Sequence, residues 1–431
     1  MKRNIIERIV IFTAGLSSVT LAERDTSQKR DTRTLDAIRS THQLPGLAAL
    51  AIYANGTLAT GAAGERKAGN TIALTTEDKF HLGSNTKAMT ATLLAKIIEK
   101  DSTLTWNTTL SSALPNITNL SSEFKNVTLA QVASHRSGIA TDVVQRDLQY
   151  WLSLFDPAYN PVQGRREIAE LFLLQRPDVT PNTSYNYSNV NYIILGHIID
   201  NFGIAWEERI RTDLWEPLNM TGCGLGPSPN SSPEAIDNPW AHNHTSAGPI
   251  PIPPLSGNTP TDNPRTIGPA GTVHCSMDSY SRFLWLHLSG LIGTSTPYLS
   301  SSTLTFLHEP LVVDTVPNSV NIMTSGGWVY LVDSSSMVKY GSGALYHAGS
   351  NSLNYAITVI SSRDNVATAA FTNVGGDQAI LGCTEVIDDI LAQDIVLRGT
   401  GRGGSASSVG ETIVTKLWWV VFACTLSFFI I

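Results

Sequence analysis

Charged residues are scarce in this sequence, and basic residues never accumulate. Asp, Glu, Lys and Arg make up 15% of the 431 residues, with 29 Lys and Arg against 36 Asp and Glu, which gives a net charge of -7. No basic run extends beyond two or three residues, so the chain lacks the positive surface that follows a phosphate backbone. We therefore expect no nucleic-acid partner.

Cysteine is also sparse, which limits both disulfides and metal sites. Of the four cysteines, Cys424 lies in the C-terminal tail, so Cys223, Cys275 and Cys383 permit at most one intrachain disulfide. We expect Cys223 to pair with Cys275, because Cys383 falls in a predicted helix where a buried thiol is ordinary. The sequence contains neither a CxxC pair nor a Cys/His cluster, and His242 and His244 lack a nearby helical Glu, so we expect no metal and no cofactor.

Long apolar runs are confined to the two ends of the chain. Residues 1–22 combine early basic residues with an apolar stretch, which is typical of a secretory signal peptide, although a frayed amphipathic helix fits too. The dibasic pair Lys29 and Arg30 would end a short pro-segment over 23–30.

The C-terminal end has the order of a lipid-anchor signal. Small residues and a polar spacer fill the linker 398–416, and the apolar run 417–431 is short for a membrane span of ~20 residues. This order is typical of a GPI signal; a retained membrane segment that starts near Thr412 is the alternative. We expect a protein of the secretory pathway, either at the cell surface or extracellular.

The density of Asn-x-Ser/Thr sequons agrees with secretion. Asn186 directly precedes the candidate catalytic Tyr187, so we expect that sequon to carry no glycan. The remaining candidates are Asn55, Asn107, Asn116, Asn119, Asn126, Asn182, Asn219, Asn230 and Asn243.

With 42% hydrophobic residues the chain can bury a large core. Strands are predicted at 47–53, 327–332, 355–361 and 366–373, and a buried helix is predicted over 84–100. Further helices are predicted near 34–40 and over 168–174, 190–202 and 378–396, whereas 226–268 has no periodicity and is predicted to be a loop. Trp240, His242 and His244 in that loop either border a site or are plain loop residues.

Ser84 and Lys87 carry the strongest chemical signal. A Ser at i and a Lys at i+3 on a helix lie one turn apart, within reach of each other. The same spacing occurs at Ser122 and Ser336, but only Ser84 opens a long buried helix, whose N-terminal amides favour an oxyanion.

Two later motifs supply partners for this pair. Tyr187 and Asn189 bring a phenol and an amide, and a phenol beside a lysine can pass a proton between nucleophile and leaving group. His347 and Gly349 precede the predicted strand at 355, where glycine permits a close backbone approach and the amide of Ser350 can face a carbonyl oxygen.

Taken in order, these motifs resemble those of the β-lactamase-related serine hydrolases, which include class C β-lactamases, D-alanyl-D-alanine carboxypeptidases, esterases and transesterases. The resemblance covers most of residues 32–396. It is carried by 80–90 (FHLGSNTKAMT), 135–138 (HRSG), 187–189 (YSN), 217–220 (PLNM) and 347–349 (HAG).

The resemblance implies the fold and the roles. We expect an α/β (α+β) domain over 31–397 with an antiparallel sheet flanked by helices, formed by 31–90 and 270–397, and a mostly helical part over 91–269. The implied catalytic residues are Ser84 as nucleophile and Lys87 with Tyr187 as the proton-transfer pair. The implied substrate-binding residues are Asn189, His347, Gly349 and Ser350.

One departure from the family pattern bears on the substrate. Class C β-lactamases usually carry Lys-Thr-Gly where this chain has His347-Ala348-Gly349, and a neutral imidazole is a poorer partner for a carboxylate than an ammonium. We therefore expect cleavage of an ester or amide in a small molecule or short peptide, ahead of β-lactam or D-amino-acid peptide hydrolysis.

Two alternatives remain beside this expectation, and a third is disfavoured by the residues. Acyl transfer to an acceptor other than water uses the same residues, and a surface protein that has lost activity would keep only the fold. A Ser-His-Asp enzyme of the α/β-hydrolase type is disfavoured, because the sequence has no G-x-S-x-G motif.

Overall fold

The computed structural model describes residues 34–254, 261–311, 322–331, 338–395 and 397–400. The proposed signal peptide, the pro-segment, most of the linker and the C-terminal apolar run lie outside these residues. Within the described ranges, no helix is both long and apolar enough to cross a membrane.

An antiparallel sheet of eight strands organises the fold, with the order β13-β2-β1-β12-β11-β10-β9-β8. The sheet joins chain segments from both ends of the domain, because the N-terminal β1 pairs with the C-terminal β12. Their register runs from Leu47 opposite Thr372 to Tyr53 opposite Val366. The strands are β1 (Gly46–Tyr53), β2 (Leu58–Gly64), β8 (Ile322–Met323), β9 (Val329–Tyr330), β10 (Leu345–Ser350), β11 (Tyr355–Ser361), β12 (Val366–Thr372) and β13 (Arg398–Thr400).

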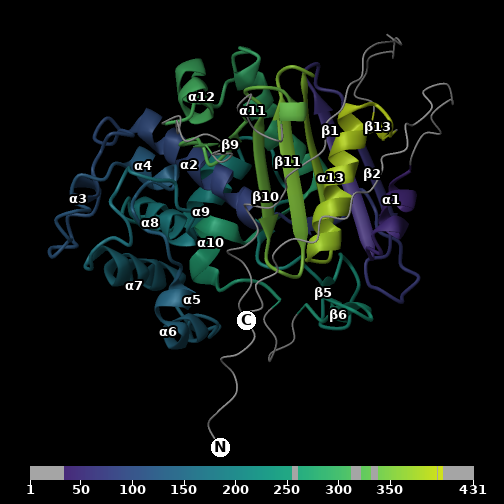
Figure 1. Cartoon of the computed structure of the whole chain (residues 1–431), viewed down its shortest axis with the longest axis horizontal. Helices are drawn as coiled ribbons and strands as arrows, with labels where there is room; N and C mark the ends of the chain where they lie inside the picture. Colours follow the sequence, from purple (N-terminus) through teal and green to yellow (C-terminus); the bar gives the residue numbers. More distant parts are fainter. Residues whose placement is uncertain (1–33, 255–260, 312–321, 332–337, 396, 401–431) are drawn as a thin grey trace, which may run out of the picture. The chain divides into compact units, whose positions relative to one another are not determined.

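Helices cover the two faces of this sheet unequally. α1 (Leu35–Thr41) and α13 (Asp377–Leu391) pack on one face, where α13 crosses β12 and β11 (Figure 1). Alternation along β1 sends Leu47 and Ala49 to this side and Ala48 and Leu50 to the other, as a period of two requires. The second face supports the larger core, into which α2 (Thr86–Lys100) and α11 (Met277–Leu291) pack.

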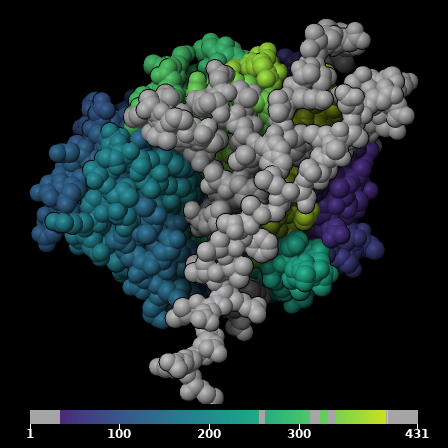
Figure 2. All heavy atoms as spheres, in the orientation of Figure 1, coloured from purple at the N-terminus to yellow at the C-terminus, as the bar shows by residue number. Residues whose placement is uncertain are grey.

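The helical part extends from α2 into a group of short and long helices. In Figure 2 the atoms of residues 110–209, blue to teal, gather on the left of the view. The helices are α3 (Leu110–Ala113), α4 (Leu129–Ala133), α5 (Val143–Arg146), α6 (Leu148–Ser153), α7 (Pro161–Leu173), α8 (Asn189–Asp200), α9 (Trp206–Arg209), α10 (Gly268–Gly271) and α12 (Ser301–His308).

The fold class is confirmed: an antiparallel sheet with helices on both sides. The helices predicted at 34–40, 168–174 and 190–202 and the strands at 47–53, 355–361 and 366–373 are present. Several local predictions were wrong. Of the strand predicted at 327–332, Val329–Tyr330 forms β9, and residue 332 lies outside the described residues. The last helix ends at Leu391, and the loop 226–268 contains a hairpin of β5 (Ala241–Thr245) and β6 (Gly248–Ile252).

That hairpin is fixed to the domain by a buried histidine. His242 accepts a hydrogen bond from the Ala68 amide at Nε2 (2.9 Å), and its Nδ1 contacts the carbonyl of Asn373 (2.7 Å). Trp240 is buried and lies under the ammonium of Lys67, whereas His244 is exposed. His242 and Trp240 are therefore anchoring residues of this segment.

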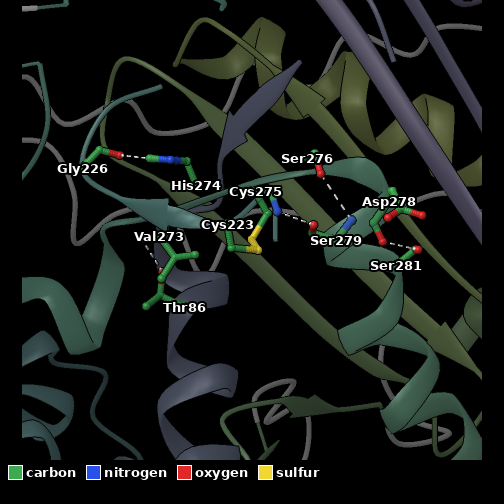
Figure 3. Close-up of a disulfide and its surroundings, with 11 residues drawn as sticks. Thr86, Cys223, Gly226, Val273, His274, Cys275, Ser276, Asp278, Ser279 and Ser281 are labelled. Carbon is green, nitrogen blue, oxygen red and sulfur yellow. Dashed lines mark hydrogen bonds between the residues drawn. A yellow bond between two sulfur atoms is a disulfide. The ribbon is translucent and has the colours of Figure 1, made fainter. Parts of the chain in front are cut away.

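A small sheet of β3 (Lys79–His81), β7 (Val273–Ser276) and β4 (Gly224–Leu225) carries the disulfide. The structure joins Cys223 to Cys275, with the two Cα atoms 4.0 Å apart (Figure 3). Cys275 lies opposite Phe80 in the register of β7 and β3. The third cysteine, Cys383, is a buried free thiol in α13.

Candidate active site

Ser84 lies in a single 3₁₀ turn, Gly83–Asn85, between β3 and α2. The small sheet holds this turn from both sides, because the Leu82 amide donates to the carbonyl of Val273 (2.8 Å) and the Val273 amide donates to Thr86 Oγ1 (3.2 Å; Figure 3). The helix thus begins at Thr86, two residues later than the sequence predicted. Ser84 is 5% exposed.

Two glycines let strand β10 approach the Ser84 turn closely. A Cβ at Gly349 would lie 2.2 Å from the carbonyl oxygen of Leu82 and 2.5 Å from the amide nitrogen of Ser84. Gly83 has a φ of +51°, and a Cβ there would lie 2.5 Å from the amide nitrogen of Ser350. The amide groups of Ser84 and Ser350 therefore lie on adjoining backbone segments, as an oxyanion site requires.

Lys87 is fully buried beside Ser84. Its ammonium donates to Ser84 Oγ (3.1 Å), to Asn189 Oδ1 (2.7 Å) and to the carbonyl of Ala270 (2.8 Å). Burial lowers the pKa of Lys87 to about 7, and the negative charge of Asp142 partly opposes that effect. The lysine can therefore exchange a proton near neutral pH.

Tyr187 completes the contacts of Ser84 from the helical side. Its hydroxyl donates to Ser84 Oγ (2.8 Å), and its ring lies 4.8 Å from the ammonium of Lys87. The ring stacks on His135 with 4.4 Å between centroids. The hydroxyl of Ser84 thus contacts both groups of the predicted proton-transfer pair.

The candidate substrate-binding residues divide between the two sides. Asn189 begins α8 and contacts Lys87, whereas His347, Gly349 and Ser350 belong to β10. His347 is buried, and its Nδ1 donates to the carbonyl of Ala348 (2.6 Å), which leaves Nε2 as an acceptor. Burial, followed by the nearby Lys87, lowers the pKa of His347 to about 3, so its ring is neutral.

Sequence reasoning missed two groups that support the site. Asp142, the residue before α5, accepts hydrogen bonds from Ser188 and Asn189. His81 accepts from the Gly83 amide at Nδ1 (3.1 Å), and its Nε2 lies 2.9 Å from the buried carboxylate of Asp262. Asp142 had one local signal, a Gln three residues later, which is typical of a capping box.

The two other Ser-x-x-Lys matches were expected to be chance occurrences. Ser122 and Lys125 are both exposed, and Ser336 lies outside the described residues. Among the residues that the structure describes, no group of three or more His, Cys, Asp or Glu side chains is arranged to hold a metal ion.

The sequon asparagines differ in exposure. Asn186 is partly buried and donates to Ser184 Oγ (2.7 Å), and Asn230 is partly buried and bonded to Ser228, Asp237 and Asn238. The exposed ones are Asn55, Asn107, Asn116, Asn119, Asn126, Asn182, Asn219 and Asn243.

The family model described as Beta-lactamase matches residues 29–390. The chain belongs to this family. It is similar to penicillin-binding protein 4 of Amycolatopsis lactamdurans, at 28% identity over 79% of this chain and 84% of that protein. It is also similar to an unguisins hydrolase of Aspergillus campestris, at 24% identity over 56% of this chain, which spans 44% of that protein.

Solved structures share the fold of this Beta-lactamase family member. The D-amino acid amidase of Ochrobactrum anthropi SV3 superposes with a TM-score of 0.62 at 16% identity, over 84% of this chain and 96% of that one. A class C beta lactamase of Rhodobacter sphaeroides superposes with a TM-score of 0.61 at 18% identity, over 83% and 98%. The recognition made from the motifs is therefore confirmed, and the chain is a β-lactamase-fold serine hydrolase by family.

Proposed function

We propose that this chain cleaves an ester or amide bond through an acyl-enzyme on Ser84. The observation that carries the proposal is the position of Ser84 Oγ, 3.1 Å from the ammonium of Lys87 and 2.8 Å from the hydroxyl of Tyr187. A hydroxyl between a buried amine and a phenol is the arrangement that activates a serine without a histidine base.

The proposed reaction proceeds in two steps. Neutral Lys87, directly or through Tyr187, takes the proton of Ser84 Oγ as that oxygen bonds to the substrate carbonyl carbon. The amides of Ser84 and Ser350 hold the oxyanion, and the proton passes to the leaving alcohol or amine as its bond to carbon breaks. Water then repeats the sequence on the acyl-enzyme, and another acceptor in place of water would make the reaction a transfer.

His347 supports a substrate without a carboxylate at this position. Its ring is neutral, and its buried Nε2 is left as an acceptor without a protein partner among the described residues, so it suits an N–H or O–H of the substrate and not an anion. The likeness to a penicillin-binding protein and to an amidase fold keeps β-lactams and D-amino-acid amides as the second substrate class.

Incubation with p-nitrophenyl acetate and a chromogenic cephalosporin, with intact-mass detection of the adduct, tests the proposal. We expect ester turnover and an added acyl mass on the wild-type protein, both absent in Ser84→Ala. The cephalosporin signal then ranks the two substrate classes.

A folded wild-type protein that gives neither turnover nor adduct would overturn the acyl-enzyme proposal and favour a retired binding protein. Turnover that persists in Ser84→Ala would instead show that the reaction uses a different nucleophile.

We also propose that the protein enters the secretory pathway and is held at the cell surface by a GPI anchor. The signal-like segments at 1–22 and 417–431 support this proposal. Release of the protein from intact cells by a phosphatidylinositol-specific phospholipase is the expected result. A protein that stays with the membrane after this treatment would favour the retained segment.

A further inference from the structure

The loop before α5 brings Asp142 to the site from outside the recognised motifs. Its backbone amide donates to Gln145 Oε1 (2.7 Å). Asp178 fixes the preceding residues, since it accepts hydrogen bonds from the amides of Ala140 (2.8 Å) and Thr141 (3.1 Å). Gln145 and Asp178 therefore fix the backbone that carries the Asp142 carboxylate.

Asp142 contacts the Tyr187–Asn189 motif through both carboxylate oxygens. Oδ1 accepts from the Asn189 amide (2.7 Å) and from Ser188 Oγ (2.8 Å), and Oδ2 accepts from Asn189 Nδ2 (3.0 Å). Because Nδ2 of Asn189 faces the carboxylate, its Oδ1 must face the other way, where it accepts the hydrogen bond from Lys87 (2.7 Å). The carboxylate thus decides which end of the Asn189 amide reaches the lysine.

Asp142 also differs in charge from the other groups around Lys87. Tyr187 and Tyr192 present rings at 4.8 and 5.7 Å from the ammonium, and His135 and His347 are buried imidazoles whose pKa values are lowered by burial and then by Lys87. Tyr192, His135 and His347 are neutral near pH 7, because burial raises the pKa of the phenol and lowers the pKa values of the two imidazoles. Asp142 is the acidic neighbour whose charge favours the ammonium form of Lys87.

We propose that Asp142 is a positioning residue for the reaction at Ser84: it orients Asn189 toward Lys87 and supplies the negative charge that opposes loss of the lysine proton. The inference rests on the proposed function. It explains how the fully buried Lys87 can keep a proton despite its burial, and why the side-chain amide of Asn189 adopts one orientation.

The rate of Ser84 phosphonylation by an alkyl fluorophosphonate, followed by intact mass from pH 5 to 9, tests this role without knowledge of the substrate. In this reaction the serine oxygen bonds to phosphorus, fluoride leaves and Lys87 with Tyr187 accepts the serine proton. We expect the wild-type rate to rise with pH through about 7, the pKa of Lys87, and Ser84→Ala to remain unlabelled.

In Asp142→Asn, the midpoint of this rise should move to lower pH, because the ammonium loses its negative neighbour. The rate at pH 9 should fall at least about tenfold, since an amide nitrogen facing Asn189 reverses that side chain. The rate at pH 6, relative to that at pH 9, should therefore increase severalfold. Asp142→Ser, which keeps a residue suited to cap α5, should shift the midpoint in the same direction.

Asp147→Asn is the matched control. Asp147 caps α6 by accepting from the Tyr150 amide (2.9 Å). Among the described residues it has no hydrogen bond to Ser188 or Asn189, so its loss should leave the pH midpoint unchanged. Unshifted midpoints in both Asp142 variants would overturn the inference even if their rates fall. A wild-type protein that is not labelled at Ser84 would overturn the proposed function, and this inference with it.

Discussion

The two sides of the site are built by different means. On the sheet side, β10 meets the Ser84 turn by direct backbone contact, and Gly83 and Gly349 leave no room for a side chain. On the helical side, Asn189 is placed by two hydrogen bonds that it donates to Asp142, and Tyr187 is placed by stacking on His135. His135 Nδ1 also accepts from the amide of Ser188 (3.2 Å).

The difference separates two requirements of acyl transfer. Backbone amides that stabilise an oxyanion must stay fixed, and contact between main chains is stiff enough for that task. Proton-transfer groups need a tuned proton affinity, which neighbouring charges and burial provide. Under the proposed function, the site therefore combines a rigid electrostatic half with an adjustable acid–base half.

The largest effect should come from breaking the sheet side. Gly349→Ala places a Cβ against the Leu82 carbonyl and the Ser84 amide, so β10 must move away and the oxyanion site opens. We expect kcat/KM for p-nitrophenyl acetate to fall about 1000-fold. Gly271→Ala is the control, since its Cβ would lie 3.8 Å from the nearest atoms, and its activity should stay within about threefold. Equal losses of kcat/KM in the two variants would contradict the claim that close backbone contact between β10 and the Ser84 turn is needed for activity.

Breaking the helical side by one atom should cost less. Tyr187→Phe keeps the ring stacked on His135 and removes the hydroxyl that contacts Ser84. We expect kcat to fall about 100-fold with KM nearly constant, because the lost contact serves proton transfer. A raised KM with unchanged kcat, measured by steady-state kinetics, would show instead that the phenol only binds substrate.

A smaller effect concerns the anchoring of the β5–β6 hairpin. Burial lowers the pKa of His242 to about 4, below the unfolded value of about 6.5. The neutral ring therefore stabilises the fold fully above pH 6.5, and this contribution is lost as the pH falls toward 4, by about 2 kcal/mol between pH 7 and pH 5.

Urea unfolding at pH 7 and pH 5 measures this loss. The pH dependence should weaken in His242→Asn and stay as in the wild type in His244→Asn, which changes an exposed residue of the same hairpin. An unaltered pH dependence in His242→Asn would mean that other groups cause the acid destabilisation.

Sequence patterns predicted elements where burial alone decides the structure. The apolar run 355–361 became β11 with the same limits, because both of its faces are covered. The end of α13 was missed, since the apolar pattern continues to Ile395 while Gln393 adopts a φ of +57° and turns the chain without a glycine. The strand β6 was not predicted because it contains Pro249 and Pro251, and proline is disfavoured within strands.

The motifs identified the residues around Ser84, and the structure brings Ser84, Lys87, Tyr187 and Asn189 together. Asp142 was not found because its proposed role depends on a contact with Asn189, the first residue of α8, which lies 47 residues later in the sequence. Spacing rules apply within one helix or strand, whereas the charge near Lys87 depends on how separate segments pack.

The Cys223–Cys275 link has a practical consequence for the study of this protein. It closes a loop over a sequence separation of 52 residues, which stabilises the fold by about 4 kcal/mol in the chain-entropy description. Cys275 belongs to β7, the strand that pairs with β3 just before the Ser84 turn. Chain produced in a reducing bacterial cytoplasm would lack that cross-link, so low or absent activity of such a preparation would reflect the reduced thiols and would not test the proposed role of Ser84. Oxidative expression is the condition under which an absent activity has meaning.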